Sequence, residues 1–194
     1  MNVLLTGATG FVGSYILAKL INSGHNVSII RRKNSNNHRI SEFINQVSVF
    51  DDVKNIKNSL KFNCIIHCAT SYEKGDYAGS EILSSNINLP VYLLDYAIHT
   101  NCKKFINIST FIAQYQSTPP NRYALTKRHF EEWGAYYSNH YPLNFVNLAL
   151  HQVYGVGDSV SKFIPWLVSE LKQNVDSIDL TKGDQERDFI NVVD

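Results

Sequence analysis

Residues 6–13 read TGATGFVG, and the three glycines in this stretch lie three residues apart. The stretch follows an apolar run at 2–6 and precedes a helical pattern, so it forms the turn from a first strand into a first helix. Gly7 would begin the turn, Gly10 would let a pyrophosphate approach the backbone, and Gly13 would let the helix pack closely on the strand. Because a helix N-terminus also attracts phosphate, the stretch predicts a dinucleotide site. A tight turn without a ligand is the alternative, since the spacing is GxxGxxG rather than GxGxxG.

The rest of the chain alternates strands with helices. Strands are predicted at 2–6, 26–30, 46–50, 64–69, 104–109 and 144–150. Helices are predicted at 11–24, about 78–100 and 120–140. This alternation indicates βαβ units and a mostly parallel sheet, and the right-handed crossover rule then favours a Rossmann-type doubly wound α/β fold. Residues 1–150 are therefore expected to form a nucleotide-binding domain. Beyond them the pattern is less regular, with a helix predicted at 164–174 and a short strand at 177–181.

The composition argues against several classes of partner. A net charge of +1 offers no broad basic field for nucleic acid or for an anionic membrane surface. No apolar run reaches the roughly 18 residues that a membrane-spanning helix needs, and the N-terminus lacks the regions of a signal peptide. Three cysteines, an odd and small number, favour reduced thiols. We expect a cytoplasmic protein that binds neither nucleic acid nor membrane.

Cys64, His67 and Cys68 invite comparison with a metal site. The sequence CIIHCA that contains them has the character of a buried strand, so the two cysteines share one face and the histidine takes the other. No second pair of ligands follows at zinc-site spacing. We therefore expect no metal.

The second predicted strand ends in basic residues. An acidic residue about 20 positions after the glycine motif would bind the ribose 2′-hydroxyl of NAD, but Arg31 and Arg32 occupy this region. A guanidinium suits a 2′-phosphate, so the pair favours NADP, with NAD possible. A solvated basic loop is the alternative.

A reactive cluster is predicted further along the chain. Tyr123 and Lys127, in the sequence YALTK, are four residues apart on a predicted helix and so share a face. A nearby ammonium would stabilise the phenolate and lower the tyrosine pKa, which suits proton exchange with a substrate oxygen. Ser109 and Thr110 end the predicted fifth strand at the sheet edge where ligands bind. Because Tyr-x-x-x-Lys is common by chance, a surface helix pair is the alternative.

Seven stretches together resemble the extended short-chain dehydrogenase/reductase family, which contains NAD(P)-dependent nucleotide-sugar epimerases, dehydratases and reductases. The stretches are TGATGFVGS, IIHCAT, NINLPVYLLDYA, INIST, YALTK, VYGVGD and RDFINVVD. They occur in the family's order over almost the whole chain. The resemblance implies an oxidoreductase that passes a hydride between a nicotinamide and a sugar carbon.

The resemblance also implies roles for individual residues. Thr110, Tyr123 and Lys127 take the catalytic positions of hydroxyl, base and lysine. Asp52 matches the acid that contacts adenine, with Asp51 the other candidate. The implied cofactor contacts are Gly7, Gly10, Phe11, Val12, Gly13, Arg31, Arg32, Asp52, Asn86, Tyr123 and Lys127.

On the substrate side, the resemblance implies that Thr110, His151 and Arg187 contact the nucleotide sugar. Arg187 matches an arginine that meets the sugar-nucleotide phosphates. His151 lies where relatives carry other polar residues, so a pocket-lining or capping role is favoured over catalysis.

A narrower resemblance links the chain to CDP-abequose synthase-like reductases. It rests on SKFIPWLV, on LTKGDQERDFI and on the short gap between IST and YALTK. Such enzymes use NADPH to reduce the C4 ketone of a CDP-4-keto-6-deoxyhexose for O-antigen sugars in lipopolysaccharide biosynthesis. An NAD-dependent nucleotide-sugar 4-epimerase and a catalytically inactive cofactor-binding module are the alternatives.

The chain is shorter than the family, so 151–194 is expected to be only the start of the substrate-binding region, with the usual C-terminal substrate domain largely missing. In the family the long helices pair across a homodimer as a four-helix bundle. Residues that could serve such an interface are Tyr92, Tyr96, Phe130, Trp133 and Tyr137. The alternative is that these side chains pack on their own sheet.

Overall fold

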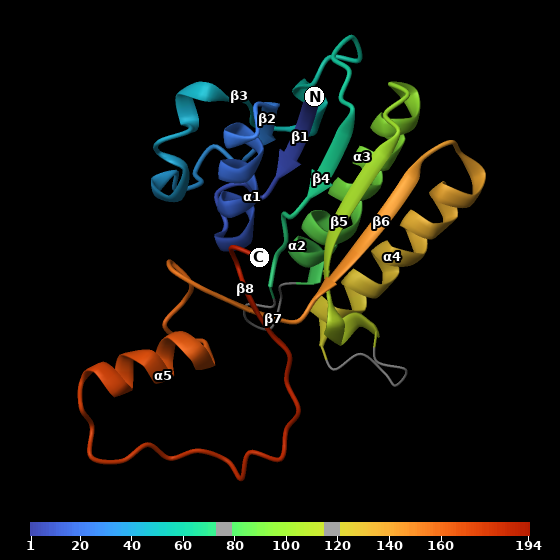
Figure 1. Ribbon diagram of the computed structural model, residues 1–194. Coiled ribbons are helices and arrows are strands. Elements are labelled where there is room, and N and C mark those ends of the chain that lie inside the picture. The colour runs from blue at the N-terminus through green and yellow to red at the C-terminus, as the bar shows by residue number, and fades with distance from the viewer. Residues whose placement is uncertain (73–78, 115–120) are drawn as a thin grey trace. The chain divides into compact units, whose positions relative to one another are not determined.

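Strand β1 (Asn2–Thr6) lies inside a six-stranded sheet of order β3-β2-β1-β4-β5-β6 (Figure 1). The other strands are β2 (Asn26–Ile30), β3 (Ser48–Phe50), β4 (Cys64–His67), β5 (Lys104–Thr110) and β6 (Asn144–Leu150). β1 pairs in parallel with β2 and β4, β2 with β3, and β4 with β5. This order is that of the doubly wound nucleotide-binding fold, so the predicted Rossmann-type α/β class is confirmed. The computed structural model describes residues 1–72, 79–114 and 121–194.

Helices cover both faces of the sheet (Figure 1). They are α1 (Phe11–Asn22), α2 (Gly79–Leu83), α3 (Leu89–His99) and α4 (Arg122–His140). Short 3-10 turns cover His38–Ile40, Ile44–Gln46, Val53–Asn55 and Phe111–Gln114. The α1 face buries Leu5 and Ile29 with Leu17, and the opposite face buries Phe105 with Leu93 and Phe130. Strands that are buried on both faces explain why they read as nearly continuous apolar runs.

The chain divides into two compact units, Met1–Ala149 and Leu150–Asp194. The second unit contains β7 (Gln152–Tyr154), α5 (Phe163–Lys172) and β8 (Phe189–Asn191), with β7 and β8 paired in parallel. Neither strand was predicted from the sequence, because each is only three residues long. The strand predicted at 177–181 is wrong, since these residues have no regular structure.

The helix predicted over about 78–100 is interrupted by a π-helical turn at Ser84–Asn88. The backbone N–H of Leu89 donates to the carbonyl of Ser84, five residues earlier. Pro90 follows, and it has no N–H to donate to the preceding turn. The proline therefore explains why the ordinary helical hydrogen bonding changes here. The expected starts of the two long helices, residues 78 and 120, lie outside the described residues.

Three of the five side chains expected at a dimer interface are buried within this chain. Tyr96, Phe130 and Tyr137 are in the core beneath α3 and α4, so they pack on their own sheet. Tyr92 and Trp133 are exposed. Over the described ranges, no helix combines the length and the apolar character that crossing a membrane requires.

Gly134 determines how closely α4 packs on the sheet. A Cβ at this position would lie 2.1 Å from Cζ of Phe145, a ring on β6. Phe145 also stacks on Phe105, with 5.8 Å between the ring centroids. The absence of a side chain at Gly134 therefore lets the helix rest directly on this aromatic pair.

We predict that Gly134→Ala destabilises the protein by about 1–3 kcal/mol, because the new methyl group overpacks a filled core. Denaturant unfolding measures the change. The matched control is the same substitution in a Phe145→Leu background, where the ring is gone and the added cost should be smaller. If Gly134→Ala lowered the free energy of unfolding equally in the two backgrounds, the contact between Gly134 and Phe145 would be contradicted.

Candidate active site

Two glycines, Gly7 and Gly13, allow the turn after β1 to pack closely on neighbouring backbone. Gly7 has a φ of +75°, and a Cβ there would lie 2.5 Å from the backbone nitrogen of Ala69. A Cβ at Gly13 would lie 2.0 Å from the carbonyl oxygen of Gly7. Gly10 is less crowded, since its Cβ would lie 3.2 Å from the same oxygen. The turn therefore packs on the loop after β4, and α1 packs on the turn.

The N-terminus of α1 is open to an anion. Gly10 is the N-cap residue, and over the described residues no side chain caps this helix. The Ser14 hydroxyl donates to the carbonyl of Phe11, 2.8 Å away, and so does not serve as a cap. The expected contacts Phe11, Val12 and Gly13 form the first turn of the helix. A glycine cradle and an uncapped helix start fit the pyrophosphate of a dinucleotide.

Arg31 and Arg32 follow directly after β2, at its carboxyl end. The Arg31 Nη1 donates to the carbonyls of Arg32 and Lys33, both 3.3 Å away, so its side chain folds over its own loop. Arg32 is exposed and pairs with Glu81 at 3.8 Å. An exposed pair of this kind is weak, so the Arg32 guanidinium can be redirected to a phosphate.

The two candidate adenine acids lie after β3. Asp52 caps the short turn that follows, accepting a hydrogen bond from the Lys54 backbone at 2.9 Å. Asp51 pairs with Lys33 at 3.7 Å. Both carboxylates are exposed, and the Asp51 pair joins the ends of β2 and β3.

Thr110, Tyr123 and Lys127 converge at the carboxyl end of β5. Thr110 is the last residue of that strand, and the other two lie in the first two turns of α4. The Thr110 hydroxyl is hydrogen-bonded to Tyr123. The Lys127 ammonium donates to the carbonyl of Ile108 at 2.8 Å. Asn121 fixes the start of α4, because its side chain accepts from the backbone N–H of Ala124 at 2.8 Å.

The electrostatics of this trio differ from the expectation. Burial, above all, raises the pKa of Tyr123, and a hydrogen bond with Tyr72 adds to the effect, while the bond with Thr110 opposes it. Burial also lowers the pKa of Lys127 to about 8. The predicted lowering of the tyrosine pKa by the lysine is therefore wrong for the chain alone. Desolvation outweighs the attraction, and the ammonium is directed to a strand carbonyl.

The side-chain amide of Asn86, an expected cofactor contact, forms its hydrogen bonds within the protein. Its Oδ1 accepts from the Ser71 backbone at 2.8 Å and from the Thr70 hydroxyl at 3.2 Å. Its Nδ2 donates to the Ser71 carbonyl and to the Thr126 hydroxyl, both at 3.0 Å. These four bonds use the full capacity of the amide, so the buried Asn86 joins the loop after β4 to the helix of Tyr123.

Tyr72 also lies at the site, although it was not predicted from the sequence. Its ring centroid lies 4.9 Å from that of Tyr123, with 36° between the ring planes. A signal was available, because Tyr72 closely follows β4 at the sheet edge where such folds bind ligands. Ser109, by contrast, was noted, and among the described residues its buried hydroxyl has no hydrogen-bond partner.

His67, at the end of β4, is hydrogen-bonded to the end of β1. Its Nδ1 shares a hydrogen bond of 2.9 Å with the Thr6 hydroxyl, which also accepts from the backbone of Ala69 at 3.2 Å. Burial lowers the pKa of His67 far below its usual value, so the ring is neutral. Cys64 and Cys68 face the other side of the sheet, as expected. Within the described part of the chain, His, Cys, Asp and Glu form no metal-binding group.

His151 and Arg187 belong to the second unit. His151 Nδ1 lies 3.6 Å from a carboxylate oxygen of Asp188, and the Asp188 carbonyl accepts from the Gln152 backbone at 3.1 Å. Arg187 precedes this aspartate and is exposed. The structure therefore brings the two expected substrate contacts to the same end of the β7–β8 pair.

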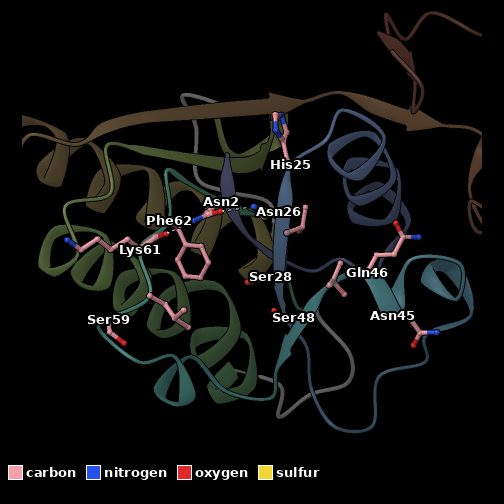
Figure 2. Close-up of a pocket in the computed structure, with 13 residues that line it drawn as sticks. Asn2, His25, Asn26, Ser28, Asn45, Gln46, Ser48, Ser59, Lys61 and Phe62 are labelled. Atoms are coloured by element: carbon pink, nitrogen blue, oxygen red, sulfur yellow. Dashed lines mark hydrogen bonds between the residues drawn. The ribbon is translucent and has the colours of Figure 1, made fainter.

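A separate hollow lies at the amino ends of the strands (Figure 2). It has a volume of about 770 Å³, and its walls include Asn2 and Asn26, the first residues of β1 and β2, with Ser48 and Lys61. The Asn26 amide donates to the Asn2 side chain at 3.2 Å. None of the candidate residues lines this hollow, so it is not the predicted site.

The strand order, the glycine cradle and the convergent trio define a nucleotide-binding protein of Rossmann type. The profile of the NAD dependent epimerase/dehydratase family matches residues 3–194. The chain belongs to this family.

Individual relatives agree with the assignment. CDP-abequose synthase of Salmonella typhimurium is 36% identical over 99% of this chain and 66% of its own length. A putative UDP-glucose 4-epimerase of Methanocaldococcus jannaschii is 25% identical over 99% of this chain and 70% of its own length. The chain thus spans a little under two thirds of the Salmonella protein.

Solved structures show the same fold. UDP-glucuronic acid 4-epimerase of Bacillus cereus, in complex with NAD, superposes with a TM-score of 0.82 at 23% identity, over 99% of this chain and 69% of the epimerase. UDP-glucose 4-epimerase of Thermotoga maritima, with UDP-glucose, gives a TM-score of 0.78 at 20% identity, over 99% of this chain and 70% of that structure.

The lowered pKa of Lys127 predicts a pH-dependent stability. Between about pH 8 and 10.5 the folded chain holds a neutral lysine while the unfolded chain still binds the proton. Relative to a Lys127→Met variant, the free energy of unfolding of the wild type should therefore rise over this range, by about 3 kcal/mol in total. Denaturant unfolding at a series of pH values measures it. Parallel curves for the two proteins would show that the lysine keeps its ordinary pKa.

Proposed function

We propose that the chain carries the cofactor site and the reactive groups of an NAD(P)-dependent oxidoreductase that acts on a nucleotide sugar. The more specific proposal is the reduction of the C4 ketone of a CDP-4-keto-6-deoxyhexose by NADPH. The observation that carries the proposal is the convergence of Thr110, Tyr123 and Lys127 beside the glycine cradle. The 36% identity with CDP-abequose synthase supports the choice of substrate class.

Each residue then has a distinct task. The turn from Gly7 to Gly13 would hold the pyrophosphate, and Arg31 and Arg32 the 2′-phosphate. Asp52 would meet the adenine. When bound, the cofactor supplies the hydride, and the protein supplies the alignment.

The proton chemistry would belong to the trio. Tyr123 would donate its hydroxyl proton to the oxygen of the ketone, and Thr110 would hold that oxygen in place. A raised pKa keeps Tyr123 protonated and therefore ready to donate. Lys127, when charged, would stabilise the phenolate that remains.

We predict that Tyr123→Phe lowers kcat by at least about 100-fold, since general acid catalysis supplies a factor of this order. NADPH oxidation with a CDP-4-keto-6-deoxyhexose measures it, and calorimetry checks that NADPH still binds. A variant as active as the wild type would contradict the assignment of the acid. Cofactor binding without turnover in the wild type would favour the inactive binding module.

We predict that NADPH binds more tightly than NADH, and that Arg32→Ala weakens NADPH binding by about tenfold through the loss of a phosphate contact. Calorimetry with each cofactor is the measurement. Lys19→Ala, which removes the same charge from the last turn of α1, is the control. A preference for NADH would contradict the NADP assignment and support an epimerase.

An NAD-dependent 4-epimerase is the second candidate. The identity with the Methanocaldococcus protein, a putative UDP-glucose 4-epimerase, favours it. An epimerase would retain its cofactor and return the hydride to the other face of the sugar, whereas a reductase would release oxidised cofactor.

The remaining proposals concern surroundings of the site. His151 and Arg187 would contact the nucleotide sugar, and Asn86 would act on the cofactor only through the loop that it holds. Exposed Tyr92 and Trp133 support a homodimer through α3 and α4. A cytoplasmic location would suit the small-molecule substrate.

A further inference from the structure

A second tyrosine lies beside the proposed acid. Tyr72 follows β4, and its ring packs on that of Tyr123 with 4.9 Å between the centroids. The two phenols share a hydrogen bond. Tyr72 is 58% exposed, whereas Tyr123 is largely enclosed. Tyr72 therefore connects a sheltered hydroxyl to solvent.

The three hydroxyls lie together at this place. Thr110 and Tyr72 are both hydrogen-bonded to Tyr123. The Tyr123 hydroxyl is therefore linked to the end of β5 on one side and to the exposed Tyr72 on the other.

Other groups near Tyr123 are poorly placed to exchange its proton. The Lys127 ammonium is bonded to the Ile108 carbonyl and is only 3% exposed. Burial raises the pKa of the neighbouring Cys68 thiol to about 11, so the thiol is a weak acid at neutral pH. Tyr72 alone combines a hydrogen bond to Tyr123 with wide exposure among these three.

We propose that Tyr72 is a proton relay, which returns a proton from solvent to Tyr123 after each turnover. The proposal rests on the proposed function. During reduction the Tyr123 hydroxyl would give its proton to the substrate oxygen, and the bound cofactor would supply the hydride. The Tyr123 phenolate then takes the Tyr72 hydroxyl proton, and Tyr72 takes one from water or a buffer acid. Each cycle consumes one hydride and one solvent proton.

The decisive experiment measures proton exchange without any substrate. Tyrosines labelled with ¹³C at Cζ give separate signals for the protonated and deuterated hydroxyl in mixed H₂O and D₂O, so exchange at Tyr123 can be timed. We predict that Tyr72→Phe slows this exchange by at least about tenfold, because the donor–acceptor path to solvent is lost. Tyr141→Phe, which alters an exposed tyrosine at the far end of α4, should leave the exchange unchanged. Unchanged exchange in Tyr72→Phe overturns the relay.

Kinetics give a second, separable test. In Tyr72→Phe the single-turnover rate should match the wild type, while the steady-state rate should fall and be restored by added imidazole. A rise in KM alone would overturn the relay and make Tyr72 a wall of the substrate site. If the wild type shows no turnover, the proposed function fails, and the exchange measurement still decides the relay.

Discussion

The close approach of Gly13 to the carbonyl of Gly7 is the constraint on which the arrangement depends. The distance of 2.0 Å for a Cβ at Gly13 leaves no room for any side chain. The contact fixes the start of α1 on the turn, and Gly7 in turn fixes the turn on Ala69. The Thr6 hydroxyl joins the same loop to β1. The two loops at the point where the strand order reverses are therefore packed against each other and joined by a hydrogen bond.

The fold could be predicted because its signals are local. The TGATGFVG turn, the apolar runs and the helical periodicities each specify one element, and the crossover rule orders them. The π-helical turn was missed because it depends on the combination of Pro90 with the side-chain bonds of Asn86 to a loop 15 residues earlier. The β7–β8 pair was missed because three-residue strands are defined by their partner rather than by their own sequence. The strand expected at 177–181 is absent for a related reason. The sequence there has a strand-like apolar pattern, but in the described structure no neighbouring strand pairs with it.

The residues of the site were easier to predict than their states. Thr110, Tyr123 and Lys127 were located by order and spacing, yet the tyrosine pKa moves opposite to the expectation, because burial is a property of the whole fold. Asn86 was identified by resemblance, but its hydrogen bonds show a residue that holds two segments together. Arg31 and Arg32 lie where a 2′-phosphate would be expected, although both guanidiniums already have partners within the chain. Contacts of this kind depend on rotamers, which spacing alone does not reveal.

The glycine at position 134 has a wider consequence. Tyr123 and Gly134 are eleven residues apart, about three helical turns, so they lie on the same side of α4. The Tyr123 phenol is therefore positioned by the contact of Gly134 with the Phe145 ring on β6 and not only by the chain that joins it to β5. Under the proposed function, insertions or deletions between Thr110 and Asn121 would alter substrate recognition while Tyr123 stays in place on its helix. Such a division between an anchored helix and its connection to β5 would let one scaffold serve different sugars.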